Sequence, residues 1–317
     1  MLCMSNSNII VHKSSHGPQS FQDQLESFFL GLLEGDGSIQ VNHWRKASLQ
    51  YRIIIKLNNT EENYRMLTFI HRKLNIGNVK ITAHGTRVSL VEDHRDRIPK
   101  IMGIIEKHGL RLTKARIRYG FFQYAFQNSI GYSEYLYLRT FRDMWEKAAY
   151  AADFHGRAPA QHSDFSGAPH PLLDFFKMLT PYKAQDILQR PHFVHWLCGI
   201  IEAEGCFSFR KSGKSCSFSL AQKYEEAFLL AVKQYFQLPN RVRRVNSHMY
   251  MLETFNVTHV QNILEFCRPG SLNALHKKAY AEKRVDSFGL LGSKETQRQE
   301  FEKRFLLLSP RLESENL

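Results

Sequence analysis

Apolar and polar positions along the first part of the chain follow a helical period in some segments and a strand period in others. Segments that alternate polar and apolar residues, such as 48–57, are typical of half-buried strands, and longer periodic segments predict helices. Together these patterns predict a helix at 22–35, strands at 38–42 and 48–57, a helix at 60–74, strands at 79–81 and 87–90, and helices at 97–107, 113–126 and 133–149.

The same succession of patterns occurs again later in the chain. The second set predicts a helix at 191–203, strands at 206–210 and 215–220, a helix at 225–236, strands at 241–246 and 248–255, a helix at 257–267 and another helix starting near 275. Two copies of one α-β-β-α-β-β-α unit predict an α+β fold built from two pseudo-symmetric halves with antiparallel sheets.

A segment rich in Ala, His, Pro, Gly and Asp separates the two copies and is predicted to be a linker. A weak amphipathic pattern at 295–308 predicts a helix that packs on the second half. The predicted organisation is an N-terminal extension at 1–20, a first half at 21–150, a linker at 151–190, a second half at 191–290 and a tail at 291–317.

The first helix of each copy ends in a closely similar nonapeptide. Residues 29–37 read FLGLLEGDG and residues 197–205 read LCGIIEAEG. Each has two small residues four positions apart, Gly31 and Gly35 in one and Gly199 and Ala203 in the other, so both lie on one helix face. Small side chains there let two helix backbones approach closely, which predicts that the two helices pair at the interface between the halves.

Asp36 and Glu204 occupy matching positions just before the glycine that ends each nonapeptide. If the two helices pair, one carboxylate from each half lies at their junction. Paired carboxylates of this kind suit a hard divalent cation such as Mg²⁺, so the sequence raises the hypothesis of a metal site.

Charge and composition narrow the class of protein. The 43 Lys and Arg residues exceed the 30 Asp and Glu residues, the formal net charge is +13, and the excess falls in both repeated halves. This distribution favours a polyanionic partner that both halves contact, although a merely basic protein is the alternative. No apolar segment approaches membrane-span length, residues 1–20 lack the pattern of a targeting signal, and the five cysteines form no C-x-x-C pair, so we expect no membrane span, disulfide framework or zinc site.

The tandem nonapeptides and the element order that follows each of them resemble the LAGLIDADG homing endonucleases of the single-chain, two-motif type. The resemblance implies that Asp36 and Glu204 bind the catalytic Mg²⁺ ions, with Gly35 and Ala203 beside them in the metal site, and that Mn²⁺ or Ca²⁺ can substitute in binding. We expect the earlier acids of the motifs, Glu34 and Glu202, to be exposed or capping residues at the helix ends.

A matched pair of basic residues follows the last helix of each half. The segments Leu112-Thr113-Lys114 and Leu275-His276-Lys277 correspond, and the resemblance implies that Lys114 and Lys277 reach the active site as catalytic residues. Arg116 and Lys278 compete for this role, and a solvated basic patch is the alternative to any role.

The resemblance also implies that the two sheets form a curved, saddle-shaped surface whose polar face enters the major groove of DNA. Because strand side chains alternate, one set of positions faces outward, and a register error of one residue would reverse the assignment. Cys206 shares the outward face. The predicted DNA-contacting residues are Ser38, Gln40, Asn42, Ser48, Gln50, Arg52, Lys56, Lys80, Thr82, Arg87, Ser89, Ser208, Arg210, Ser215, Ser217, Ser219, Arg241 and Arg243.

Three functions compete at this point. The first is a monomeric, site-specific endonuclease that cuts double-stranded DNA and leaves short 3′ overhangs. The second is a group I intron maturase that binds its own intron RNA, with or without residual cleavage, and the third is a basic nucleic-acid-binding scaffold without chemistry. The retained acids favour cleavage, and the resemblance implies an organellar location, in a mitochondrion or chloroplast.

Overall fold

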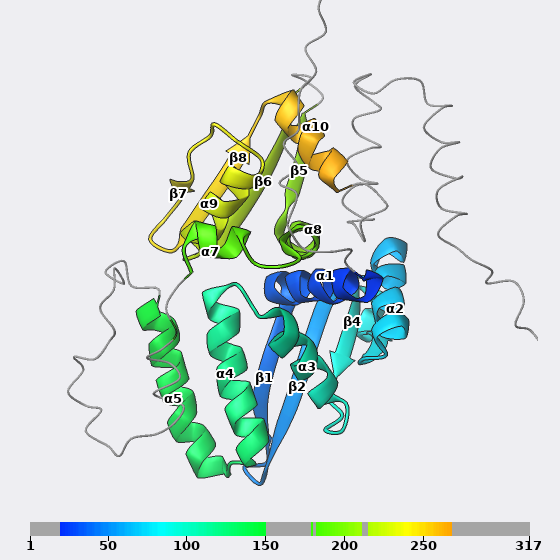
Figure 1. Cartoon of the computed structure of the whole chain (residues 1–317). Coiled ribbons are helices and arrows are strands. Elements are labelled where there is room, and N and C mark those ends of the chain that lie inside the picture. The colour runs from blue at the N-terminus through cyan, green and yellow to red at the C-terminus, as the bar shows by residue number, and fades with distance from the viewer. Residues whose placement is uncertain (1–19, 150–178, 180–181, 211–214, 268–317) are drawn as a thin grey trace, which may run out of the picture.

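The structure is a computed structural model that describes residues 20–149, 179, 182–210 and 215–267 (Figure 1). Its first half contains one four-stranded sheet and the helices around it. The elements of this half are α1 (Phe21–Asp36), β1 (Gly37–Trp44), β2 (Ser48–Asn58), α2 (Glu61–Leu74), β3 (Asn78–Ile81), η1 (Ala83–Gly85), β4 (Arg87–Glu92), α3 (Ile98–His108), α4 (Thr113–Asn128) and α5 (Tyr132–Ala149).

The second half repeats this order on a smaller scale. Its elements are α7 (Ala184–Leu188), α8 (Phe193–Glu204), β5 (Cys206–Arg210), β6 (Ser215–Lys223), α9 (Glu226–Tyr235), β7 (Arg243–Arg244), β8 (Met249–Thr254) and α10 (Val257–Phe266). The helices predicted near residue 275 and in the tail lie outside the described residues. Within the described ranges, no helix has both the length and the apolar character that crossing a membrane requires.

The two sheets have the same antiparallel topology. The strand orders are β1-β2-β4-β3 and β5-β6-β8-β7. The register also agrees, because Gly37 at the start of β1 pairs with Ile55, and Cys206 at the start of β5 pairs with Ser219. In each half the motif helix is followed by an edge strand of the sheet. The predicted α+β class with two repeats is confirmed.

Local sequence signals explain where several helices begin and end. The side chains of Ser20, Thr60 and Asn256 accept hydrogen bonds from backbone N–H groups of the first helical turns that follow them. Asn75, in the left-handed conformation that asparagine tolerates, ends α2. Gly37 ends α1, and its N–H returns to the Leu33 carbonyl.

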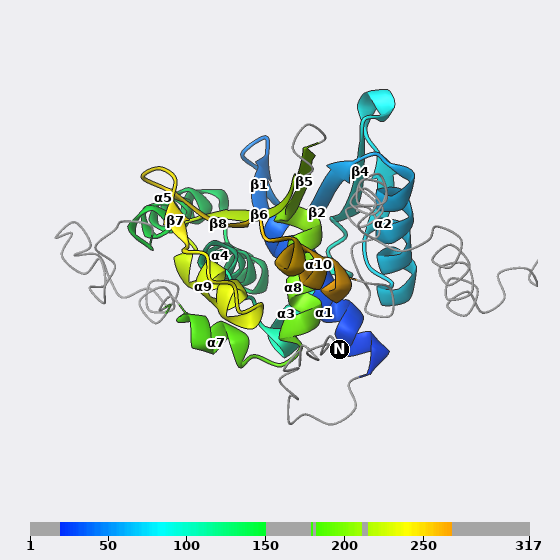
Figure 2. The ribbon, with the colours of Figure 1, turned by 90° about the horizontal axis from the view of Figure 1, so that it is seen from above.

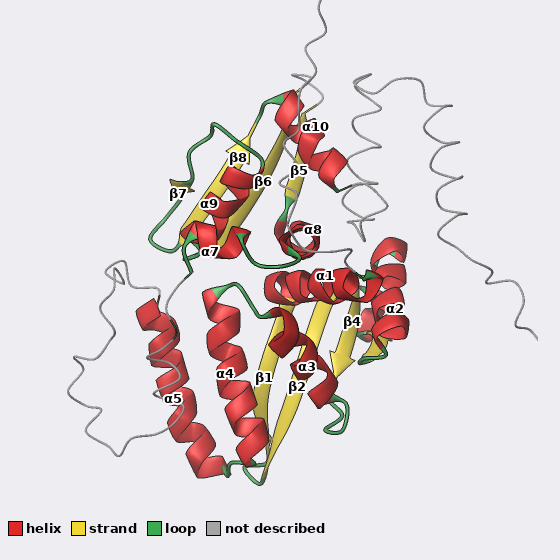
Figure 3. Ribbon diagram, viewed as in Figure 1, coloured by secondary structure: helices red, strands yellow, loops and turns green. Residues whose placement is uncertain are grey.

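Helices cover one face of each sheet and leave the other face open (Figures 1 and 3). In β2 the inward residues Tyr51, Ile53 and Ile55 are buried, whereas Lys56 is exposed. The buried apolar residues of both halves form one continuous core, and α1 and α8 lie side by side at its centre. Figure 2 shows strands of both sheets on the same side of this helix pair.

Two segments differ from the predicted elements. The strand predicted at 241–246 is limited to Arg243 and Arg244, because Val245 and the following residues turn back toward β8. Part of the predicted linker is folded, since α7 packs on α9 and buries Ile187, which is 1% exposed. The other linker residues are largely outside the described ranges, and the domain boundaries stay predictions.

Candidate active site and nucleic-acid interface

The two motif helices are in backbone contact through their small residues. A Cβ atom on Gly31 would overlap the Trp196 carbonyl and lie 3.0 Å from the Ile200 nitrogen. A Cβ on Gly199 would overlap the Phe28 carbonyl in the same way. Larger side chains would force the helices apart, so the spacing of glycines in the sequence is explained by this interface.

The same interface brings the ends of the two helices together. A Cβ on Gly35 would overlap the side chain of Ala203 and lie 3.3 Å from Cγ of Glu204. Asp36, the next residue, ends α1 and is exposed, and Glu204 ends α8 and is partly exposed. One carboxylate from each half therefore lies at the junction between the halves.

The electrostatics of this junction fit a divalent cation. Asp36 and Glu204 both lie at helix C-termini, where the helix dipole is negative, and neither helix has a basic residue in its last turn. A carboxylate is unfavourable in such a place unless positive charge lies nearby. Oxygen ligands from two carboxylates are the kind that Mg²⁺ or Ca²⁺ prefers, so the residues present fit the metal that the sequence predicts.

Lys114, in the first turn of α4, lies close to this junction. Its pKa is lowered, mainly by burial and then by the charge of Arg118, while Glu146 and Glu204 oppose the change. Its Nζ lies 3.9 Å from Oε1 of Glu146. The predicted partner of Lys114 in the second half, Lys277, and its rival Lys278 lie outside the described residues.

Arg116, the rival of Lys114, has a different environment. Its guanidinium lies 3.9 Å from the centre of the Tyr182 ring, a cation–π contact with the segment that leads into α7. Burial lowers its pKa. In the described chain Arg116 thus packs against an aromatic ring, whereas the charge of Glu204 acts on the pKa of Lys114.

Glu34 is partly exposed, and its hydrogen-bond partners belong to segments other than its own helix, which corrects the expectation of an exposed or capping residue at the end of that helix. Its carboxylate accepts hydrogen bonds from the backbone N–H groups of Arg111 (2.9 Å) and Leu112 (2.6 Å), and from Nε1 of Trp196 (2.7 Å). Burial raises its pKa to about 7, although these hydrogen bonds favour the ionised form. Glu202, at the matching position of the second motif, is buried, with 3% exposure, whereas Glu34 is partly exposed.

Sequence reasoning missed two further charged residues near the junction. Glu225 is 6% exposed and accepts a 2.6 Å hydrogen bond from the Thr113 N–H, and burial raises its pKa to about 7. Arg111 is 2% exposed, donates to the Pro191 carbonyl at 2.7 Å, and lies 4.6 Å from the centre of the Trp196 ring. No local pattern marks either residue, because their hydrogen-bond partners are 77 to 112 positions away in the sequence.

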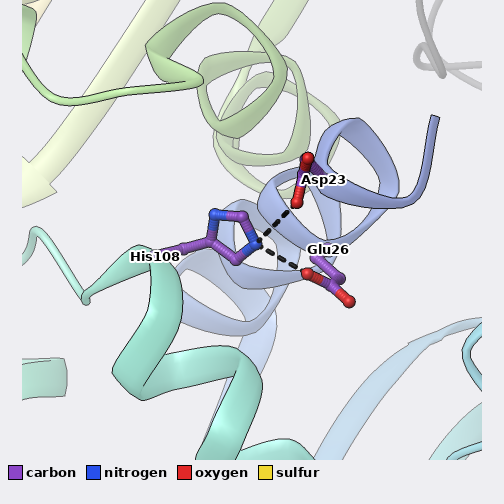
Figure 4. A group of neighbouring side chains, drawn as sticks. All are labelled: Asp23, Glu26 and His108. Atoms are coloured by element: carbon purple, nitrogen blue, oxygen red, sulfur yellow. Dashed lines mark hydrogen bonds and ion pairs between the residues drawn. The ribbon is translucent and has the colours of Figure 1, made fainter. Parts of the chain in front are cut away.

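A second group of possible metal ligands lies at the opposite end of α1. Figure 4 shows Asp23, Glu26 and His108, whose ligand atoms lie within 4.8 Å of one another. The ammonium of Lys107 lies 2.6 Å from Asp23 and 2.8 Å from Glu26, and it lowers the pKa of Asp23 to about 2. This group is therefore an ion-pair cluster that joins α1 to the end of α3, with the Lys107 ammonium within ion-pair distance of both carboxylates.

The outward faces of the sheets carry most of the predicted DNA-contacting residues in accessible positions. Along β1, Gln40 donates to Ser38 at 2.9 Å and Asn42 donates to Gln40 at 3.2 Å, so these amides form one polar row. The exposed members of the predicted set are Asn42, Ser48, Gln50, Lys56, Lys80, Arg87, Ser208, Arg241 and Arg243. The partly exposed members are Ser38, Gln40, Arg52, Thr82, Ser217 and Ser219.

Ser89 is the exception to the predicted set. It is 3% exposed in the central strand β4, directly between Lys56 and Lys80 of the neighbouring strands, and the prediction that it contacts DNA is wrong. The short side chain of Ser89 is thus flanked on the same face by two longer lysine side chains. The side chains of Arg210 and Ser215 lie outside the described part of the chain.

Comparison with known proteins agrees with this architecture. A family model described as LAGLIDADG endonuclease matches residues 29–126. The "Probable intron-encoded endonuclease aI3" of Debaryomyces hansenii is 30% identical over 263 residues, which cover 78% of this chain and 36% of that protein. The protein of the same name from Dictyostelium citrinum is 29% identical over 76% of this chain and 86% of its own length. The chain thus spans well under half of the first of these relatives.

Solved structures show the same fold. The LAGLIDADG homing endonuclease I-LtrWI bound to target DNA is similar with a TM-score of 0.54, 17% identity, and coverage of 93% of this chain and 100% of that one. The meganuclease I-CpaMI bound to uncleaved DNA gives a TM-score of 0.54 with 15% identity over 87% of this chain and 96% of that one. With its tandem motif helices and two matching four-stranded sheets, the chain belongs to the LAGLIDADG endonuclease family.

Proposed function

We propose that this protein is a monomeric, site-specific homing endonuclease that cuts both strands of a long, asymmetric DNA target. The observation that carries the proposal is the meeting of α1 and α8 at Gly35 and Ala203, with Asp36 and Glu204 as the following residues. A duplicated helix end with one carboxylate per half is suited to two phosphodiester bonds, one on each strand. The predicted products have short 3′ overhangs from cleavage across the minor groove.

Asp36 and Glu204 would hold the divalent metal, with Gly35 and Ala203 beside them. When bound, Mg²⁺ supplies Lewis-acid stabilisation of the phosphate and a lowered pKa of the attacking water. The carboxylates of this chain fix the place of the reaction at the junction between the halves. The charge of Glu204 acts on the pKa of Lys114, and in this proposal the Lys114 ammonium offsets charge that develops on the phosphate during displacement.

The open faces of the sheets would form a saddle against the major groove. The row Ser38, Gln40 and Asn42 offers hydroxyl and amide groups, which suit base edges, and Lys56 and Arg87 supply positive charge on the same sheet. The net charge of +13 favours phosphate contacts, so affinity should fall as salt rises. Two solved structures with the same fold are bound to DNA, which supports DNA as the partner of this chain.

The experiment that tests the proposal is cleavage of a plasmid library of candidate target sites by the full chain. We expect linear product with Mg²⁺ and none when EDTA is added, and sequencing of the ends should give short 3′ overhangs. The proposal would be wrong if linear product still formed in EDTA. It would also be wrong if no site were cleaved in a library that covers the insertion sites of related introns.

A maturase that binds its own intron RNA is the second candidate, favoured by the relatives that are named as intron-encoded. The two activities can coexist in one chain. Binding of intron RNA and rescue of its splicing without any DNA cleavage would favour this candidate over the first. The same names support an origin in an organellar intron, and the proposed location is a mitochondrion or chloroplast.

A further inference from the structure

We propose that Glu34 and Glu225, one carboxylate from each half, together cap the N-terminus of α4 and act as positioning residues for Lys114. The inference deepens the proposed function and rests on it, because Lys114 matters only if the junction performs chemistry. It assigns roles to a partly exposed acid, Glu34, and a buried acid, Glu225, neither of which belongs to the proposed metal or DNA site.

The start of α4 needs an external cap. Its N-cap residue is Leu112, whose side chain has no hydrogen-bonding atom, and no side chain caps the helix from within its own first turn. The first N–H groups of any α-helix lack partners inside the helix and must find them elsewhere when they are shielded from water. Leu112 and Thr113 are both buried here, so these groups depend on the protein for acceptors.

Glu34 supplies the first acceptor. Its Oε2 receives the N–H groups of Arg111 and Leu112, at 2.9 Å and 2.6 Å, while Oε1 receives the indole N–H of Trp196. Glu34 belongs to the last turn of α1, two residues before Asp36. The helix end that presents the first metal-binding carboxylate is thereby tied to the backbone just before Lys114.

Glu225 supplies the second acceptor from the other half. Its Oε1 receives the Thr113 N–H at 2.6 Å, Oε2 lies 3.4 Å from the Thr113 hydroxyl, and the Lys114 backbone N–H also donates to it. Glu225 directly precedes α9, and α9 packs on β6 and β8 of the second sheet. The backbone of Lys114 is therefore held from the half that carries Glu204.

These contacts supply hydrogen-bond acceptors at the start of α4 and also attach it to both halves. Ordinary caps come from the residue before the helix, as Ser20 caps α1. Here the acceptors come from 77 and 112 positions away, so α4 begins at a place fixed by both halves. Because misplacement of a catalytic group by about 1 Å can cost ~100-fold in rate, such a double attachment is a means of setting where Lys114 lies.

The decisive experiment is a double-mutant cycle on the full chain, with Glu225→Gln, Lys114→Met and the combined variant. The substrate is the duplex that the library identifies, and the readout is the single-turnover rate in Mg²⁺ beside duplex affinity in Ca²⁺. We expect Glu225→Gln alone to lower the rate about 10- to 100-fold with affinity within about threefold, and to change the rate less than about twofold once Lys114 is replaced. Equal fractional losses in both backgrounds would overturn the positioning role.

A second measurement tests the cap and does not depend on DNA cleavage. Amide hydrogen exchange in the DNA-free protein should speed up at least about tenfold at residues 111–114 in Glu225→Gln and in Glu34→Gln, with the strands unchanged. Glu226→Gln, which neutralises the adjacent exposed acid, is the matched control and should leave exchange at 111–114 unaltered. Unchanged exchange in both test variants would overturn the cap.

The two measurements separate the failure of this inference from the failure of the proposed function. If the wild-type chain cuts no duplex, the endonuclease proposal and the role of Lys114 fail together, and the exchange data still decide whether the cap exists. If Glu225→Gln does not fold, Glu34→Gln replaces it in the cycle with the same expected outcomes.

Discussion

The carboxylate of Glu34 accepts a 2.7 Å hydrogen bond from the indole Nε1 of Trp196, across the boundary between the two halves of the molecule. Trp196 is 1% exposed, and the guanidinium of Arg111 lies 4.6 Å from the centre of its ring. A buried indole N–H needs an acceptor, and a buried arginine gains from an aromatic face and a nearby carboxylate. Trp196 therefore contacts both the Glu34 carboxylate and the Arg111 guanidinium at the interface between the halves.

Replacing Trp196 by Phe should destabilise the protein by about 2 to 4 kcal/mol. The substitution leaves a gap in the core and deprives the Glu34 carboxylate of one donor. Urea unfolding, followed by circular dichroism, measures the loss. Trp44→Phe, at the exposed tip of the first hairpin, is the control and should change stability by less than about 0.5 kcal/mol.

Replacing Gly31 by Ala should destabilise the interface by at least about 2 kcal/mol. The added Cβ would overlap the Trp196 carbonyl, and backbone atoms of the partner helix cannot move aside without separating α1 from α8. Gly103→Ala in α3 is a matched control, since nothing lies within 4 Å of its Cβ. The control should be neutral or stabilising by up to ~1 kcal/mol because alanine favours helix. Similar thermal midpoints for both variants would contradict the close approach of the helices.

The sequence was sufficient for features that local chemistry determines. The helix that ends at Asp36 and its copy that ends at Glu204 follow from apolar periodicity, a small residue every fourth position and a terminal glycine. The outward direction of Gln40 and Gln50 follows from strand alternation, because the inward neighbours Val41 and Tyr51 are apolar. A repeat in the sequence also predicted the repeated sheet topology.

Features that depend on distant partners were not predictable in this way. Glu34 looks like a helix-end acid until the backbone of Arg111 and Leu112 is placed beside it. Glu225 precedes a helix, which suggests only a local capping role, yet its acceptor oxygens serve α4. Strand alternation places Ser89 on the outward face of the sheet. The sequence does not show that Lys56 and Lys80 flank it, because that depends on the strand register.

Replacing the acids at the junction should abolish double-strand cleavage and preserve DNA binding. Asp36→Asn or Glu204→Gln removes the charge of a proposed metal ligand from one half while keeping nearly the same shape. Affinity for the duplex that the wild type cleaves should therefore stay within about threefold. Gel analysis of plasmid cleavage beside a filter-binding assay measures both effects. Asp96→Asn, which neutralises an exposed acid in the loop before α3, serves as the control. Full cutting by either test variant would remove that residue from the catalytic role.

His195 on α8 should make the protein less stable as the pH falls from about 6.5 to about 4. Burial, assisted by the charge of His192, lowers the pKa of His195 to about 4, so the folded protein resists protonation that the unfolded chain accepts. In this window the unfolded state binds more protons, and the free energy of unfolding therefore decreases with decreasing pH. Because His195 is only partly buried, we expect about 1 to 2 kcal/mol between pH 7 and pH 5 rather than the full value of the shift.

The measurement for His195 is urea unfolding of the wild type and of His195→Gln at pH 7 and pH 5. The variant lacks the titrating group, so the wild type should lose more stability than the variant when the pH is lowered. His94→Gln, at an exposed position before α3, controls for the replacement of an imidazole elsewhere in the chain. A stability difference between wild type and His195→Gln that is the same at both pH values would show that burial does not hold this imidazole in its neutral form.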